Sequence, residues 1–158
     1  MEKRGGSRSA SFEPKIVAFC CHYCAYAAAD LCGTVRLQYQ PHVRIIKVPC
    51  SGRVSEEHIL HAFAAGADGV CVAGCLEGNC HFQTGNIRAR QRVQRVKEML
   101  AEVGLEPERL QMYHLSAAMG QRFAEIVREM VALIRELGPS PLAAGSNAAG
   151  VAPEAVRG

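Results

Sequence analysis

The most constraining feature of this sequence is a set of three short apolar runs, each followed closely by cysteine. Continuous apolar runs of this kind are typical of strands buried on both faces of a parallel sheet. Helix-forming segments separate the runs, and such alternation favours parallel strands joined by right-handed crossovers. The predicted strands are these runs, residues 15–20, 43–48 and 69–73, together with a fourth at residues 109–115.

Helix signals fill the intervals between these strands. Ser55 is a good N-cap before an acidic first turn, and a helical stripe of apolar residues starts at Val93. Gly85-Asn86 leads into that third helix, and Gly104 suits its end. The predicted helices span residues 24–37, 56–65, 87–103 and 121–137.

This order predicts a small three-layer, doubly wound, flavodoxin-like α/β fold with a four-stranded parallel sheet in the order 2-1-3-4. Residues 14–138 form the predicted domain. The segments on either side are rich in Gly, Ser, Ala or Pro, so we expect a disordered arm at residues 1–13 and a disordered tail at residues 139–158.

Composition narrows the function classes. The net charge of +3 on 158 residues gives no reason to expect nucleic acid as a partner. We see no secretory signal and no apolar run long enough to span a membrane, so we expect a cytoplasmic protein. Its eight cysteines are then expected to be reduced, and clustered reduced cysteines indicate metal or redox chemistry.

Five cysteines are expected to meet at one edge of the sheet, where the strands end. Ligand sites of open parallel sheets lie at the carboxyl ends of the strands, and neighbouring strands are only about 4.8 Å apart. The remaining cysteines, Cys20, Cys32 and Cys71, lie inside predicted elements and are interpreted as small buried apolar residues. The candidate metal ligands are Cys21, Cys24, Cys50, Cys75 and Cys80.

Three kinds of chemistry fit these residues. Four thiolates bind either an iron–sulfur cluster or a structural zinc, and the scattered spacing fits the cluster better than zinc. A zinc-binding interaction module without a redox role therefore remains an alternative. Cys21 and Cys24 alone have the spacing of a dithiol oxidoreductase. We also expect the helix that follows Cys24 to favour its thiolate form.

The third predicted helix carries five basic residues without an acidic residue among them. Such a run is typical of a solvated helix face, and it also suits docking to an acidic partner. The basic residues are Arg88, Arg90, Arg92, Arg95 and Lys97.

Three segments resemble one known family. They are F-C-C-H-Y-C-A-Y-A-A-A-D, R-L-Q-Y-Q-P-H-V-R-I-I-K-V-P-C-S-G-R-V and G-A-D-G-V-C-V-A-G-C-L-E-G-N-C-H-F-Q-T-G-N, and they resemble the delta subunit of methyl-viologen-reducing hydrogenase, the MvhD/FlpD family. The resemblance implies a [2Fe–2S] electron-transfer subunit. It also implies a position between a hydrogenase or other oxidoreductase module and the HdrA-like flavoprotein of a heterodisulfide reductase complex, in flavin-based electron bifurcation.

The family's cysteines fall on the same five positions of this chain. A [2Fe–2S] cluster needs four ligands, so one of the five is spare. The resemblance favours Cys50, Cys75 and Cys80 as ligands and leaves the choice between Cys21 and Cys24 open.

Overall fold

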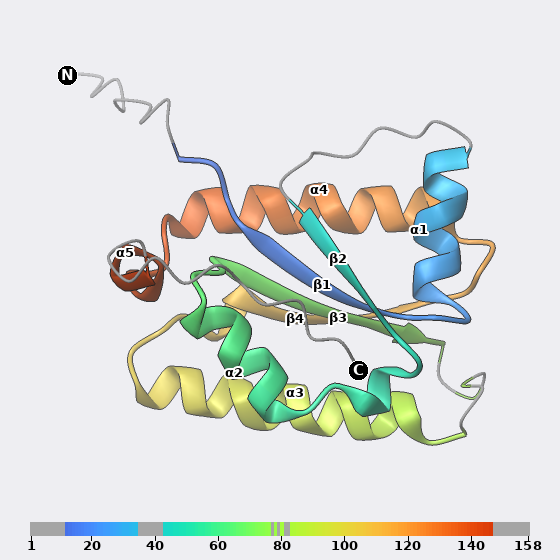
Figure 1. The fold of residues 1–158 in the computed structure, drawn as a ribbon, viewed down its shortest axis with the longest axis horizontal. Coiled ribbons are helices and arrows are strands. Elements are labelled where there is room, and N and C mark those ends of the chain that lie inside the picture. The colour runs from blue at the N-terminus through green and yellow to red at the C-terminus, as the bar shows by residue number, and fades with distance from the viewer. Residues whose placement is uncertain (1–11, 35–42, 77, 79, 81–82, 147–158) are drawn as a thin grey trace, which may run out of the picture.

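A four-stranded parallel sheet with helices on both faces forms the centre of the computed structural model, which describes residues 12–34, 43–76, 78, 80 and 83–146 (Figure 1). The strand order, β2-β1-β3-β4, and the parallel pairing confirm the predicted α/β fold. Every residue of the central strand β3 is buried, as its continuous apolar sequence predicts. The strands are β1 (Ile16–Cys21), β2 (Val43–Val48), β3 (Gly69–Cys75) and β4 (Leu110–Leu115).

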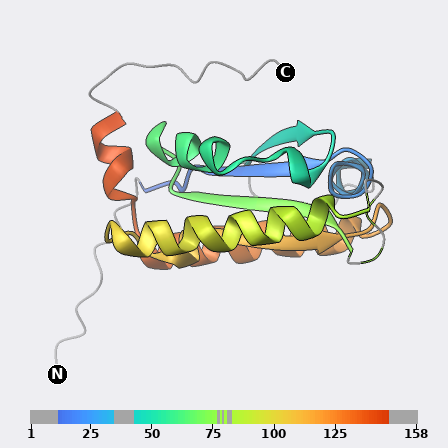
Figure 2. The ribbon, with the colours of Figure 1, turned by 90° about the horizontal axis from the view of Figure 1, so that it is seen from below.

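The helices divide between the two faces of the sheet. In Figure 1, α1 (Ala25–Thr34) and α4 (Gly120–Leu137) lie above the strands, whereas α2 (Glu56–Ala64) and α3 (Gly85–Glu102) lie below them. Figure 2 shows the resulting layers from a second direction. Short 3-10 turns, η1 (Ser51–Arg53) and η2 (Pro107–Arg109), precede α2 and β4.

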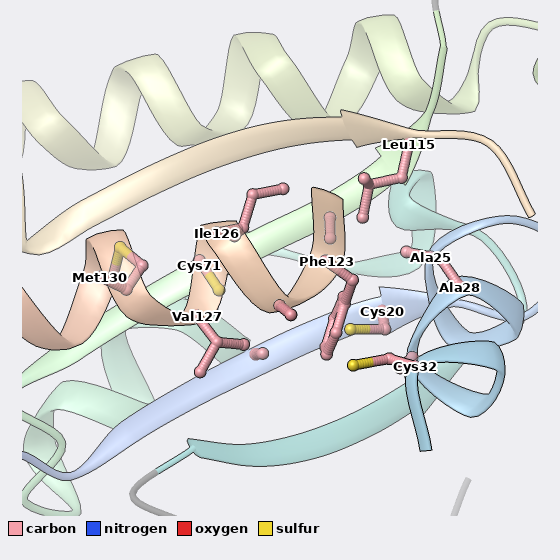
Figure 3. Close-up of a cluster of buried hydrophobic side chains, with 14 of the residues drawn as sticks. Cys20, Ala25, Ala28, Cys32, Cys71, Leu115, Phe123, Ile126, Val127 and Met130 are labelled. Carbon is pink, nitrogen blue, oxygen red and sulfur yellow. The ribbon is translucent and has the colours of Figure 1, made fainter. Parts of the chain in front are cut away.

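Each face has its own core. On the α2–α3 side the core contains Phe63, Val72 and Val96, and on the α1–α4 side it contains Phe123 and Ile134. The three cysteines expected to be buried apolar residues are buried on this second side, and Figure 3 shows them close to Phe123 and the other side chains of α4. They are Cys20, Cys32 and Cys71.

Several element boundaries differ from the prediction. The strand expected to stop before Gly74 continues to Cys75, because a buried strand tolerates glycine where another segment approaches closely. At Gly74 that segment is η1: a Cβ at this position would lie 2.7 Å from the Ser51 hydroxyl oxygen. The third predicted helix begins two residues early, at Gly85.

The ends of the chain also differ in part from the prediction. The first helix begins at Ala25 and is described to Thr34, so its expected last turn lies outside the described residues. Residues Pro141–Ser146, which we expected in a disordered tail, form the short helix α5. The arm expected at residues 1–13 and the rest of that tail lie almost entirely outside the described residues.

A network of polar groups closes the edge of the sheet where the strands begin. The Asp68 carboxylate accepts hydrogen bonds from the amides of Lys15 and Ser140, both at 2.9 Å. Arg109 is 1% exposed and donates to Glu106 at 2.7 Å, and this contact lowers the pKa of the glutamate carboxyl. Its other acceptors are the carbonyl oxygens of Asp68, Leu137, Gly138 and Pro139.

None of the helices within residues 12–34, 43–76 and 83–146 has both the length and the apolar character needed to cross a membrane.

Candidate metal centre

Three thiols converge at the carboxyl ends of the two central strands. Cys21 is the last residue of β1 and Cys75 is the last residue of β3, and these strands are parallel neighbours. Their sulfur atoms lie 3.8 Å apart. Cys24 follows in the turn before α1, and the three sulfur atoms all lie within 4.8 Å of one another. The sequence analysis left open whether Cys21 or Cys24 is a ligand, and the structure brings both of them next to Cys75.

This donor set fits a tetrahedral, thiolate-bound metal. A metal–sulfur distance of about 2.3 Å in tetrahedral geometry separates two sulfur ligands by about 3.8 Å. The separation of 3.8 Å between the sulfur atoms of Cys21 and Cys75 matches that value. Iron and zinc both accept such a set, so this geometry supports a metal centre without choosing between them.

The other two candidate ligands meet at the first residue of α3. A Cβ at Gly85 would lie 2.2 Å from the Cys50 sulfur and 3.4 Å from the Cys80 sulfur. Both sulfur atoms therefore lie against the backbone of Gly85, in space that any side chain would fill. The amide of His22 donates to the carbonyl of Val48 at 2.8 Å. This bond holds the ends of β1 and β2 together, and it therefore keeps Cys50, which follows β2, near the end of β1.

Backbone amides point at two of these sulfur atoms. The amide of Ala25 donates to the Cys21 sulfur, and that of Gly52 donates to the Cys50 sulfur, each at 3.4 Å. Such N–H···S bonds stabilise the thiolate and help to set the reduction potential of a thiolate-bound cluster.

Burial nevertheless dominates the acid–base behaviour of the free thiols. Burial raises the pKa of Cys21, although the amides of Ala25 and Cys24 oppose this effect. Burial likewise raises the pKa of Cys50 against the amide of Gly52. It also raises the pKa of Cys24, so the thiolate form that we expected the helix start to favour is disfavoured overall by burial. A metal must therefore displace protons from these sulfur atoms.

The start of α3 holds the cysteine-bearing segments together, which sequence analysis missed. The side-chain amide of Asn86, 0% exposed, donates to the carbonyls of Cys75 at 3.2 Å and Leu76 at 3.0 Å. Further along the helix, the Arg92 guanidinium donates to the carbonyls of Gly52 and Val54. The basic run suggested a solvated helix face, but Arg92 is bound to η1 and to the residue after it and is not part of such a face.

Gly52 and Gly85 allow η1 and α3 to pack backbone to backbone. A Cβ at Gly52 would lie 2.8 Å from the Cα of Gly85. The one sequence signal for this arrangement was the T-G-N triplet, which carries Gly85 and Asn86 and which we treated as part of the resemblance.

A shallow hollow opens beside the Cys50 sulfur atom. It has a volume of about 350 Å³, and its lining includes Cys50, Gly85 and two exposed cations, Arg53 and Arg88. Cys24 and Cys80 are only partly buried. The site therefore lies near the surface, at an edge that a second protein can approach. Three polar residues near Cys80 in the sequence, Glu77, Asn79 and His81, lie outside the described residues.

Fold and site together define a class: a small parallel α/β protein that presents clustered thiols at the carboxyl ends of its strands. Within that class the chain belongs to the family described as methyl-viologen-reducing hydrogenase, delta subunit, which residues 16–138 match. The resemblance noted in the sequence is thereby confirmed.

Known proteins similar to this chain carry related names. One is the iron-sulfur subunit of the F420-non-reducing hydrogenase of Archaeoglobus profundus, 46% identical over 131 residues, which cover 83% of this chain and 96% of the relative. Another is the iron-sulfur subunit of the F420-non-reducing hydrogenase vhu of Methanopyrus kandleri, 50% identical over 129 residues, or 82% and 98% of the two chains.

A third relative is much longer. It is a subunit of the ferredoxin/F420H2-dependent CoB-CoM heterodisulfide reductase of Methanosarcina acetivorans, and it is 46% identical over 126 residues. The matched segment covers 80% of this chain but only 16% of that protein.

Proposed function

We propose that this chain is an iron–sulfur electron-transfer subunit that holds one [2Fe–2S] cluster. Four ligands are drawn from Cys21, Cys24, Cys50, Cys75 and Cys80. The chain relays electrons between a hydrogenase, or another oxidoreductase module, and an HdrA-like flavoprotein, where they serve flavin-based electron bifurcation. The observation that carries this proposal is the set of three sulfur atoms within 4.8 Å at the strand ends.

The chain's own residues provide a partly buried set of thiols. The ends of β1 and β3 fix Cys21 and Cys75, which are 2% and 3% exposed, and Gly85 leaves room for Cys50 and Cys80. When bound, the cluster supplies a centre that accepts and returns one electron. The amides of Ala25 and Gly52 favour the thiolate form of their sulfur partners, and the surrounding burial keeps water from most of the site.

The names of the relatives support the proposed partners. Two similar proteins are called iron-sulfur subunits of hydrogenases, and they match this chain over nearly their whole length. In another relative, the matching segment is part of a longer chain named for a heterodisulfide reductase. A domain found both in hydrogenases and within such a reductase is suited to join the two.

The chemistry of the thiols favours this function over a dithiol oxidoreductase. A nucleophilic cysteine needs a lowered pKa, whereas burial raises the pKa of both Cys21 and Cys24. Ligation by a metal removes this obstacle, because the metal replaces the proton.

Anaerobic purification followed by iron and sulfide counts, visible absorption and low-temperature EPR tests the proposal. We expect about two irons per chain and an S = 1/2 signal on reduction. A colourless, zinc-loaded protein that gives no signal even after iron–sulfide reconstitution overturns it and promotes a zinc-binding interaction module.

Single Cys→Ser variants then identify the ligands. We expect the variant at Cys75, whose sulfur neighbours those of Cys21 and Cys24, to lose the cluster. Of the Cys21 and Cys24 variants, we expect one to lose it and the other to keep it. Cys32→Ser is the matched control, because that sulfur is buried in the core on the α1–α4 side. Loss of iron from the control as readily as from the Cys75 variant contradicts the ligand assignment.

A further inference from the structure

The first two residues of α3 contact every segment that carries Cys50, Cys75 and Cys80. Gly85 lies against the sulfur atoms of Cys50 and Cys80, and Asn86 binds the carbonyl of Cys75. These contacts link one point of the chain to Cys50, which is distant in sequence, and to Cys75 and Cys80, which precede that point more closely. Neither residue offers a sulfur ligand, so their part in the site is to leave space and to donate hydrogen bonds.

The hydrogen bonds of Asn86 use its whole side chain. Its Nδ2 atom donates to the carbonyls of Cys75 and Leu76, and its Oδ1 atom accepts from the amide of Ile87 at 2.9 Å. The residue is fully buried, so water does not replace a lost bond. The carbonyls of Cys75 and Leu76 lie where the chain leaves β3 and begins the loop to Cys80. Asn86 therefore fixes the direction in which the chain departs from one candidate ligand toward another.

A tight turn joins Cys80 to the start of α3. The amide of Gln83 donates to the carbonyl of Cys80 at 2.9 Å, and Gln83 has a φ of 60°, which turns the chain sharply into Thr84 and Gly85. Thus the start of α3 is linked to Leu76 by the Asn86 side chain and to Cys80 through the turn at Gln83.

We propose that Asn86 is a positioning residue for the metal centre and that Gly85, by lacking a side chain, leaves the space that the sulfur atoms of Cys50 and Cys80 occupy. Together the two residues hold Cys50, Cys75 and Cys80 at one site. This inference rests on the proposed function, since it concerns how the same thiolates are held. Asn86 acts on this site through the Cys75 and Leu76 carbonyls and does not itself contact a sulfur atom in the contacts described above.

Asn86→Asp is the sharpest test, because it keeps the shape of the side chain and replaces its donor with an acceptor facing two carbonyls. We expect anaerobically purified, full-length variant to lose iron to an excess of chelator about 10- to 100-fold faster than the wild type, as for other residues that orient metal ligands. Its remaining EPR signal should also change in shape, a change that a uniform loss of stability does not produce.

Gln94→Glu is the matched control. It makes the same amide-to-acid change on an exposed position of the same helix. If Asn86→Asp loses iron no faster than this control and keeps the wild-type EPR signal, the inference is wrong. If Asn86→Asp fails to fold, Asn86→Ser decides, because its shorter side chain removes the Nδ2 donor without adding a charge: iron loss faster than in the wild type supports the inference, and the wild-type rate overturns it.

Gly85→Ala gives an independent test, because we expect it to favour the helix while weakening the retention of iron. Alanine is the better helix former, yet its methyl group would overlap the Cys50 sulfur at 2.2 Å. We expect unchanged or higher helix content in the metal-free protein, together with at least a roughly tenfold faster loss of iron. Wild-type retention of iron overturns the role of Gly85. A wild type that never contains iron instead refutes the proposed function itself, so the two failures are distinguishable.

Discussion

At the scale of single residues, the eight cysteines of this chain divide by their surroundings rather than by their spacing. Those at the strand ends face one another, whereas Cys71 lies inside β3 and is packed against the helices of the α1–α4 side. Burial raises the pKa of Cys71 to about 12. Its thiol is therefore a neutral core group at physiological pH.

This burial predicts a loss of stability in alkali. The folded protein keeps the Cys71 proton up to about pH 12, but an unfolded cysteine releases it near pH 8.5. The unfolded state thus binds fewer protons between these values, and the free energy of unfolding falls as pH rises through that window, by about 1.4 kcal/mol per pH unit. Below the window this contribution is fully present.

Urea unfolding of the wild type and of Cys71→Ala between about pH 8 and pH 11 measures the effect. We expect the variant to be less stable at the lower pH because it leaves a cavity, but to lose stability less steeply as pH rises. Parallel slopes for the two proteins contradict the assignment to Cys71, since the other titrating groups are common to both.

At the scale of elements, α2 illustrates how local signals can be sufficient. Ser55 accepts a hydrogen bond from the amide of His58 at 3.1 Å, and the His58 ring accepts one from the amide of Ser55 at 3.0 Å. We expect Ser55→Ala to cost about 1 kcal/mol of stability, measured by urea unfolding.

Ser51→Ala is the contrasting control for that prediction. The Ser51 hydroxyl is buried in η1 and has no hydrogen-bond partner among the described residues. Removing it should leave stability unchanged or slightly higher. An equal loss in both serine variants contradicts the capping interpretation.

The strands and most of the helices were predictable from sequence because their signals are local. A strand buried on both faces must be apolar throughout, and Ser55 marks a helix start without help from the rest of the fold. The errors at Gly74 and Gly85 have the opposite cause. Both glycines serve close approaches between segments distant in sequence, so propensity alone treats them as breaks.

The same distinction applies to the site. The convergence of Cys21, Cys24 and Cys75 was predictable because strand ends in a parallel sheet meet at one edge. The roles of Gly52, Asn86 and Arg92 were not predictable from the sequence, because each depends on which backbone atoms a neighbouring segment places beside that residue.

At the scale of the whole molecule, the buried polar network of Arg109 and the candidate metal centre lie at opposite ends of the strands. Arg109 and Asp68 close the edge where the strands begin, and the thiols occupy the edge where they end. We expect Arg109→Ala to cost about 3 kcal/mol or more, because it leaves several buried carbonyls without a donor. Urea unfolding measures this loss, and Arg135→Ala, an exposed arginine on α4, is the control.

The EPR signal of Arg109→Ala, recorded under conditions where it remains folded, should match that of the wild type. A changed signal contradicts the separation of the two edges.

The basic surface beside the site, formed by Arg53 and Arg88, is suited to an acidic partner. The first turn of α3 contains no acidic residue, although acidic residues are the ones that stabilise a helix start. If the proposed HdrA-like flavoprotein docks here, we expect Arg88→Glu to weaken its binding about tenfold at low salt, with the difference shrinking at high salt.

Arg135→Glu carries the same change of charge at the far end of α4 and is the control for this binding measurement. Equal weakening by both variants shows an effect of net charge and contradicts a docking role for the basic surface.

The carboxylate of Asp68 has a consequence for how this domain can be reused. By binding the amides of Lys15 and Ser140, it ties together the segments that precede β1 and follow α4. Figure 1 shows the start of β1 and the end of α4 on the same side of the sheet. A domain whose entry and exit lie side by side can be inserted into a loop of a host protein, or fused to either end of one, without strain on its working edge. The relative in which the matching segment makes up 16% of a longer chain is the natural counterpart of such a graft.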